Sequence, residues 1–166
     1  PPYMKQIRHE LIYEVYESAS ELQPNDFDLL EKAKSAISGS YAPYSRFHVG
    51  ASVKLANEEI FTGSNQENMS FPAGLCAERV AIFAAASSCP DVPVSALAIS
   101  AFAEAFEVSE PVLPCGMCRQ AVMEYEMKWN QKIRVILGGH SGRVFVFDGM
   151  ENLLPLAFIE KGLVKA

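Results

Sequence analysis

Three cysteines constrain the fold of this 166-residue chain more than any other feature. Cys115 and Cys118 form a Cys-x-x-Cys pair after Pro114, at the start of an amphipathic segment, and Cys76 opens an alanine-rich helical segment. Helix N-termini carry a partial positive charge and free N–H groups, which favour thiolate, the form that ligates metal. If the fold brings the two helix starts together, three sulfurs surround one Zn²⁺ and the fourth position stays open to water, as in catalytic zinc sites.

Two other interpretations of the cysteines remain open at this point. A Cys-x-x-Cys pair alone also suits a redox pair, which would leave Cys76 unexplained. A structural zinc site would need a fourth ligand, and Cys89 is the remaining cysteine. Cys89 lies at the far end of the helix that Cys76 opens, about 20 Å away at ~1.5 Å per residue, so we interpret it as a buried thiol.

The helix after Cys76 carries its only charges in its first turn. The run from 80 to 86, VAIFAAA, is apolar on every side and predicts a helix buried all round. Arg79 shares a helical face with Cys76, and its charge would balance the net −1 of three thiolates and Zn²⁺. Glu78 could take a proton from water at the metal and pass it to a leaving group. The alternatives are a salt bridge from Arg79 to a distant carboxylate and a helix-start role for Glu78.

The remaining periodicities predict strands that alternate with helices, hence an α/β sandwich with a mixed sheet. The segment from 94 to 102 is nearly all apolar, like a strand buried on both faces. The N-terminal segment, from 3 to 17, favours an edge strand. Further strands are expected at 49–56, 60–63, 133–137 and 144–147, and helices at 24–39, 76–88, 115–129 and, as a short closing helix, 153–159.

Composition limits the class of protein. With 49% hydrophobic and 20% charged residues, the chain is expected to form one folded domain. The net charge of −6 argues against binding nucleic-acid polymers or an acidic membrane surface. No apolar run approaches the ~18 residues that span a bilayer. Four cysteines are too few for a disulfide scaffold, and their metal-binding pattern, with no evident leader, indicates the cytoplasm.

The motifs resemble those of the cytidine deaminases, whose zinc signature is His or Cys, any residue, Glu, and then Pro-Cys-x-x-Cys. Here it reads Cys76-Ala77-Glu78 and then Pro114 to Cys118, and the all-cysteine form followed by Arg79 resembles the small homotetrameric nucleoside deaminases. The stretches YAPYSRFHVGAS, NQEN, GLCAERVAIF and PCGMCRQ agree as well, and the resemblance runs from about 26 to 158.

This resemblance implies a three-layer α/β/α sandwich with a mixed five-stranded sheet, and it allows one extra N-terminal edge strand. Residues 1–25 would be an N-terminal extension and 26–166 the zinc-dependent deaminase domain. The implied activity is hydrolytic deamination of cytidine and 2′-deoxycytidine to uridine and 2′-deoxyuridine in pyrimidine salvage. The implied partners are a nucleoside substrate and further copies of the chain in a homotetramer.

The resemblance also implies roles for single residues. Glu78 would move the protons, Cys76, Cys115 and Cys118 would bind Zn²⁺, and Arg79 would support them. The residues implied in substrate binding are Phe47 for stacking on the ring, Asn65 and Glu67 for the ribose with Gln66 between them, Ala77 for the base edge, and Phe158 from a neighbouring subunit.

The sequence departs from the family pattern at a few positions. His48 stands where many relatives have proline, and Met69 and Phe71 replace an expected alanine and tyrosine, the latter with loss of a hydroxyl. Two alternative functions remain open. One is deamination of another nucleoside or of an aminopyrimidine antibiotic, and the other is an inactive interaction module that zinc stabilises.

Overall fold

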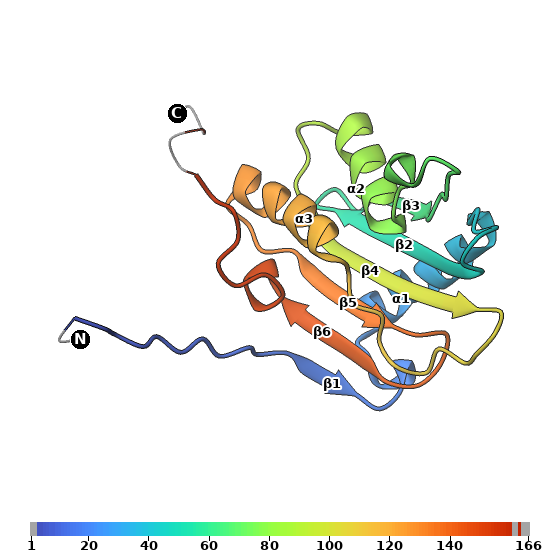
Figure 1. Cartoon of the computed structure of the whole chain (residues 1–166), viewed down its shortest axis with the longest axis horizontal. Coiled ribbons are helices and arrows are strands. Elements are labelled where there is room, and N and C mark those ends of the chain that lie inside the picture. Colours follow the sequence, from blue (N-terminus) through green and yellow to red (C-terminus); the bar gives the residue numbers. More distant parts are fainter. Residues whose placement is uncertain (1–2, 161–162, 164–166) are drawn as a thin grey trace.

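A computed structural model describes residues 3–160 and 163 of the chain (Figure 1). Within these residues a six-stranded sheet has the order β1-β6-β5-β4-β2-β3. β4 pairs with β5 in parallel, and the other neighbours pair antiparallel, so the predicted mixed sheet with an extra edge strand is confirmed. The strands are β1 (Glu14–Tyr16), β2 (Phe47–Leu55), β3 (Ile60–Ser64), β4 (Val94–Ala103), β5 (Arg134–Gly138) and β6 (Val144–Asp148).

Helices cover both faces of the sheet and complete the three layers, as Figure 1 shows. Helix α1 (Pro24–Ala36) buries Leu29, Leu30 and Ala33 against one face, in contact with side chains of β4, β5 and β6. Helices α2 (Ala77–Ser88) and α3 (Gly116–Trp129) pack on the other face, where the larger apolar core lies. The predicted α/β/α sandwich is therefore correct, because each helix presents one apolar stripe to a sheet that is apolar on both faces.

Strand β4 lies in the centre of the sheet and is buried on both faces, as its apolar run predicts. It pairs with β2 from Phe47 opposite Ala103 to Leu55 opposite Val94. Ser100 is its buried polar residue, and its hydroxyl donates to the carbonyl of Gly139 at 2.8 Å. The long β2–β4 pairing fixes where β2 begins, and that end of the strand lies next to the candidate site described below.

Helix α2 packs unusually close to β3 because Gly63 has no side chain. A Cβ at Gly63 would lie 2.6 Å from the backbone nitrogen of Ala81 and 2.8 Å from the carbonyl oxygen of Ala77. Real Cβ contacts are longer than this, so only glycine permits the approach. The glycine thereby sets the position of the N-terminus of α2, where Cys76 and Glu78 lie.

Three details differ from the sequence prediction. The closing helix expected at 153–159 is absent, and a 3₁₀ turn at Met150–Asn152 stands just before it. Pro155 has no N–H to donate, and Leu156 has a left-handed φ of 60°, so the chain cannot continue as a helix. Helix α2 is not buried all round, since Phe83 is 42% exposed on the face turned away from the sheet.

The third difference concerns the N-terminal segment. Only Glu14–Tyr16 pair with β6, and residues 3–13 run as an extended, exposed segment beside the body of the protein (Figure 1). Among the described residues, no helix is long and apolar enough to cross a membrane.

Candidate active site

The two helix starts meet, as the cysteine pattern predicts. Cys76 is the N-cap residue of α2 and Cys115 is the N-cap residue of α3, with Cys118 buried in the first turn of α3. The three Sγ atoms all lie within 4.8 Å of one another, and those of Cys115 and Cys118 are 3.6 Å apart. In the part of the chain that the structure describes, these three sulfurs form the one cluster that could hold a metal ion.

The donor set fits zinc. A tetrahedral ion with Zn–S bonds of about 2.3 Å separates its sulfur ligands by about 3.8 Å, close to the spacing of these sulfurs. Cys89 is not part of the cluster, since its Sγ lies 3.8 Å from the carboxylate of Glu59. It is only half-buried, so the prediction of a buried thiol was wrong, whereas the prediction that it is no ligand agrees with its position.

Charge at the cluster is arranged as expected from the sequence. A terminal nitrogen of Arg79 lies 3.7 Å from the Sγ of Cys76, and the Nε atom of Arg79 is buried without a partner among the described residues. A hydrogen bond from Cys118, helped by the Arg79 guanidinium, lowers the pKa of the Cys76 thiol to about 5. Cys118 donates that bond, so the pKa of its own thiol is raised. Cys76 is therefore ready as thiolate before a metal binds.

Glu78 is the second residue of α2, two positions after Cys76, and is 5% exposed. Burial raises the pKa of its carboxyl above the ordinary value of 4.5, and the negative charge on Cys76 adds to the effect. A carboxyl with a raised pKa next to a metal site can both accept and return a proton near neutral pH. Burial and the raised pKa are compatible with the acid–base role that the sequence predicts for Glu78.

A cavity of about 780 Å³ opens beside the cysteines. Its lining combines Cys76, one of the three clustered cysteines, with the NQEN motif, which follows β3: Asn65 and Glu67 lie in the same wall as Cys76 and Arg79. Aromatic and apolar side chains complete the wall, namely Tyr44, Phe71, Pro72, Leu75 and Met117. Nucleosides need this combination of an apolar slot and a few polar groups.

Asn65 and Glu67 are held by neighbouring backbone. The amide of Asn65 accepts from the N–H of Val49 at 2.8 Å and donates to the carbonyl of Phe47 at 2.9 Å, so it fixes the start of β2. The Oε2 atom of Glu67 accepts the backbone N–H groups of Tyr44 at 2.8 Å and Ser45 at 3.2 Å. Both backbone bonds end on Oε2, and the side chain of Ser45 bonds to the same carboxylate.

The remaining sequence-predicted residues are placed in different ways. The side-chain amide of Gln66 donates to the carbonyl of Gly39 at 3.1 Å and to the hydroxyl of Ser64. Gln66 also lines the cavity. The Phe47 ring stacks on Phe106 with centroids 6.3 Å apart and is not among the residues that line the cavity. Ala77 is fully buried at the first position of α2, and Phe158 is 72% exposed.

Two residues of the PCGMCRQ motif received no role from the sequence. Arg119 donates to the carbonyl of Pro114 at 2.7 Å and to that of Leu153 at 2.6 Å, tying the cysteine loop to the C-terminal segment. Gln120 exchanges two hydrogen bonds with the backbone of Phe158. Their position directly after Cys118 was the available signal, but both partners are backbone groups that no residue pattern reveals.

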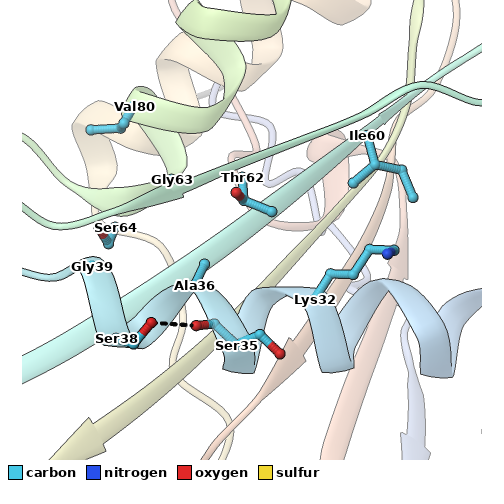
Figure 2. A pocket seen from close by; sticks show the side chains of 10 residues that line it. All are labelled: Lys32, Ser35, Ala36, Ser38, Gly39, Ile60, Thr62, Gly63, Ser64 and Val80. Atoms are coloured by element: carbon cyan, nitrogen blue, oxygen red, sulfur yellow. Dashed lines mark hydrogen bonds between the residues drawn. The ribbon is translucent and has the colours of Figure 1, made fainter.

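A second cavity lies between α1 and β3 and is drawn in Figure 2. Its lining includes Lys32, Ser35, Thr62 and Val80, and Figure 2 shows the hydroxyl of Ser38 bonded to Ser35. No cysteine, histidine or carboxylate is among its lining residues, so it offers none of the usual protein ligands of zinc. The chemistry of the chain therefore centres on the cavity beside Cys76.

Comparisons with known proteins agree with this site. The model of the cytidine and deoxycytidylate deaminase zinc-binding region matches residues 24–131. A cytidine deaminase of Halalkalibacterium halodurans is 37% identical over 130 residues, which cover 78% of this chain and 91% of that protein. The crystal structure of a cytidine deaminase from Burkholderia pseudomallei, 35% identical, superimposes with a TM-score of 0.69 over 82% of this chain and 100% of its own.

A cytidine deaminase structure from Mycobacterium tuberculosis, 29% identical, covers 80% of this chain and 96% of its own with a TM-score of 0.62. The matched region contains all three clustered cysteines, Glu78 and the NQEN motif. The chain belongs to the cytidine and deoxycytidylate deaminase family.

Proposed function

We propose that this protein is a zinc-dependent hydrolase that deaminates cytidine and 2′-deoxycytidine, giving uridine and 2′-deoxyuridine with release of ammonia. One observation carries the proposal: Cys76, which belongs to the three-sulfur cluster and lies two residues before the buried Glu78, lines a cavity whose wall also holds Asn65 and Glu67. The relatives named above are cytidine deaminases, which supports the same substrate class.

Cys76, Cys115 and Cys118 would hold Zn²⁺, and Arg79 would balance the net negative charge of the thiolates. When bound, zinc acts as a Lewis acid that lowers the pKa of water and so supplies a nucleophile at neutral pH. Glu78 takes the proton of the attacking water, passes one to N3 of the cytosine ring, and delivers one to the amine that departs from C4. Its raised pKa suits this role, because a carboxylate that is too weakly basic would not take the proton from water in the first step.

The rest of the substrate is held by groups around the cavity. The backbone N–H of Ala77, at the first position of α2, has no partner within the helix and is free to donate to the base edge. The carboxylate of Glu67 and the amide of Asn65 would receive the ribose hydroxyls, with Gln66 securing the strand end between them. Phe47, whose ring packs on Phe106 in this structure, would stack on the pyrimidine ring, as the family resemblance implies.

The assembly is part of the proposal. The exposed rings of Phe83 and Phe158 suit burial against further copies in a homotetramer, in which Phe158 would reach a neighbour's site. The backbone of Phe158 is anchored to Gln120, so its ring projects from a fixed point. We further propose that residues 1–25 are an extension to the deaminase domain at 26–166, and that the protein serves pyrimidine salvage in the cytoplasm.

An ammonia-release assay on a panel of nucleosides, with metal analysis of the same sample, tests the function. Ammonia from cytidine and 2′-deoxycytidine and about one zinc per chain are expected. Glu78→Gln should keep its zinc and fold but lose turnover by about 100- to 10,000-fold, because an amide cannot carry the proton. Glu58→Gln, at the exposed β2–β3 turn, is the matched control.

Three results would count against the proposal. Preference for an aminopyrimidine other than cytidine would reassign the substrate. Full activity of Glu78→Gln would remove Glu78 from the mechanism. A zinc-loaded protein that releases no ammonia from any nucleoside would leave the interaction module as the better account.

A further inference from the structure

A hydrogen-bonded chain of three side chains lies next to the nucleoside cavity and has no part in the proposed chemistry. The Nδ1 atom of His48 bonds to the hydroxyl of Ser40, and its Nε2 atom lies 3.1 Å from Oε1 of Glu104. A carboxylate only accepts, so Nε2 carries the hydrogen and donates to Glu104. In the neutral ring, Nδ1 then accepts from the Ser40 hydroxyl.

These three residues come from the ends of three different elements. Ser40 ends the 3₁₀ turn after α1, His48 is the second residue of β2, and Glu104 follows β4 directly. The loop from 41 to 46 begins directly after Ser40 and ends directly before the Phe47–His48 pair. The imidazole therefore joins both ends of this loop to the end of the central strand.

The loop needs such a restraint because its last residue is strained. Arg46 has a φ of 55°, a left-handed conformation that side chains other than glycine rarely adopt. Its N–H donates to Ala42 at 3.0 Å, and its carbonyl accepts the N–H of Glu104 at 3.2 Å. The backbone and side chain of Glu104 thus both act on the same turn.

The loop in turn orients Glu67. The two N–H groups bonded to the Glu67 carboxylate belong to Tyr44 and Ser45, in the middle of the loop. The Tyr41 carbonyl also accepts the N–H of Glu67 at 2.8 Å. Hydrogen bonds, that from the Ser45 side chain first, lower the pKa of Glu67. His48 is therefore connected to Glu67 through this loop.

We propose that His48, held between Ser40 and Glu104, is a positioning residue that fixes the loop from 41 to 46 and so presents Glu67 to the sugar of the substrate. This inference rests on the proposed function. It assigns His48 to sugar affinity and not to the chemical step, because the ring bonds to Ser40, directly before the loop, and to Glu104, whose N–H bonds to Arg46 at the end of the loop. Removal of the ring should weaken nucleoside binding and leave proton transfer intact.

The test compares His48→Ala with His140→Ala in the full chain loaded with zinc. Both rings pack on Phe102, with centroids at 6.2 Å and 5.4 Å, but His140 has no side-chain bond to the loop. His48→Ala should raise KM for cytidine about tenfold with kcat nearly unchanged, the pattern of lost binding. The Ki of free cytosine, which has no sugar, should stay as in the wild type.

Three further variants guard against a folding defect. Ser40→Ala and Glu104→Ala each remove one hydrogen bond of the His48 ring and should raise KM in the same direction by less. His48→Gln, which keeps a donor toward Glu104, should recover part of the affinity. A merely structural role would instead lower kcat, zinc content and the affinity for cytosine together.

Hydrogen exchange gives a readout that does not depend on activity. In His48→Ala, the amides of Tyr44 and Ser45 should exchange about tenfold faster than in the wild type, while those of β5 stay unchanged. Unchanged exchange, or an unchanged KM in His48→Ala, overturns the proposal. If the wild type releases no ammonia from cytidine, the proposed function fails, and exchange still decides whether His48 holds the loop.

Discussion

Arg119 should matter for both stability and metal retention, although it touches neither substrate nor metal. Its guanidinium, part-buried, bonds the carbonyls of Pro114 and Leu153 at 2.7 Å and 2.6 Å. Hydrogen bonds with one charged partner contribute about 1.5 kcal/mol each at the lower end, so Arg119→Ala should cost about 3 kcal/mol. For a domain of this size that lowers Tm by about 6–12 °C.

The same change should weaken zinc binding because Pro114 precedes the ligand Cys115. A loop released from Arg119 no longer holds Cys115 opposite Cys76, and loss of such supporting groups typically costs about 10- to 100-fold in metal affinity. Thermal unfolding with and without added zinc, and zinc competition against a chromophoric chelator, measure the two effects.

The matched control is Arg143→Ala. Arg143 pairs with Glu110 at 2.7 Å, but both side chains are largely exposed, so solvent screens the pair and its loss should be barely measurable. If Arg119→Ala moves Tm and zinc affinity no more than this control, the view that Arg119 braces the cysteine loop is refuted.

Three other expectations can be tested with the same protein. Burial raises the pKa of Glu126 above 4.5, so the folded state binds more protons than the unfolded state, and the protein loses stability as pH rises through that region. In denaturant titrations at pH 5 and 7, the Glu126→Gln variant should not show this loss of stability. Chelation of zinc should raise the number of thiols that react with a disulfide reagent from one, Cys89, to all four, and equal counts would argue against a thiolate site. Asn65→Asp cannot donate to the carbonyl of Phe47, so both a lower Tm and a higher KM for cytidine are expected, and a change in neither would contradict the role given to Asn65.

The secondary structure was largely predictable because it depends on local periodicity. The apolar run of β4 and the apolar stripe of α1 both predict which of their residues are buried. The closing segment failed for a local reason, since Pro155 interrupts an apolar pattern that otherwise suits a helix. The predicted burial of α2 was wrong for a different reason. Its many alanines suggest burial on every side, but its outer face does not contact the sheet and stays exposed at Phe83.

The cysteine cluster was also predictable, because cysteines at two helix starts can bind one metal ion together when the fold brings the two starts into contact. The contacts around it were not. Arg119 binds the carbonyls of Pro114 and Leu153, and Glu67 binds the N–H groups of Tyr44 and Ser45; each partner is a backbone group, present at every position of any sequence. Residue identity cannot select among them, so only the tertiary structure could.

The sequence by itself determined which chemistry the chain carries, since thiolate, carboxylate and guanidinium groups are properties of residue types at fixed spacing. The tertiary structure decided how these groups are aimed. It did so through Gly63, which lets α2 approach β3, and through the His48 and Arg119 contacts between segments far apart in the chain. Distances across a packed core follow from the simultaneous fit of many side chains, and no local pattern contains that information.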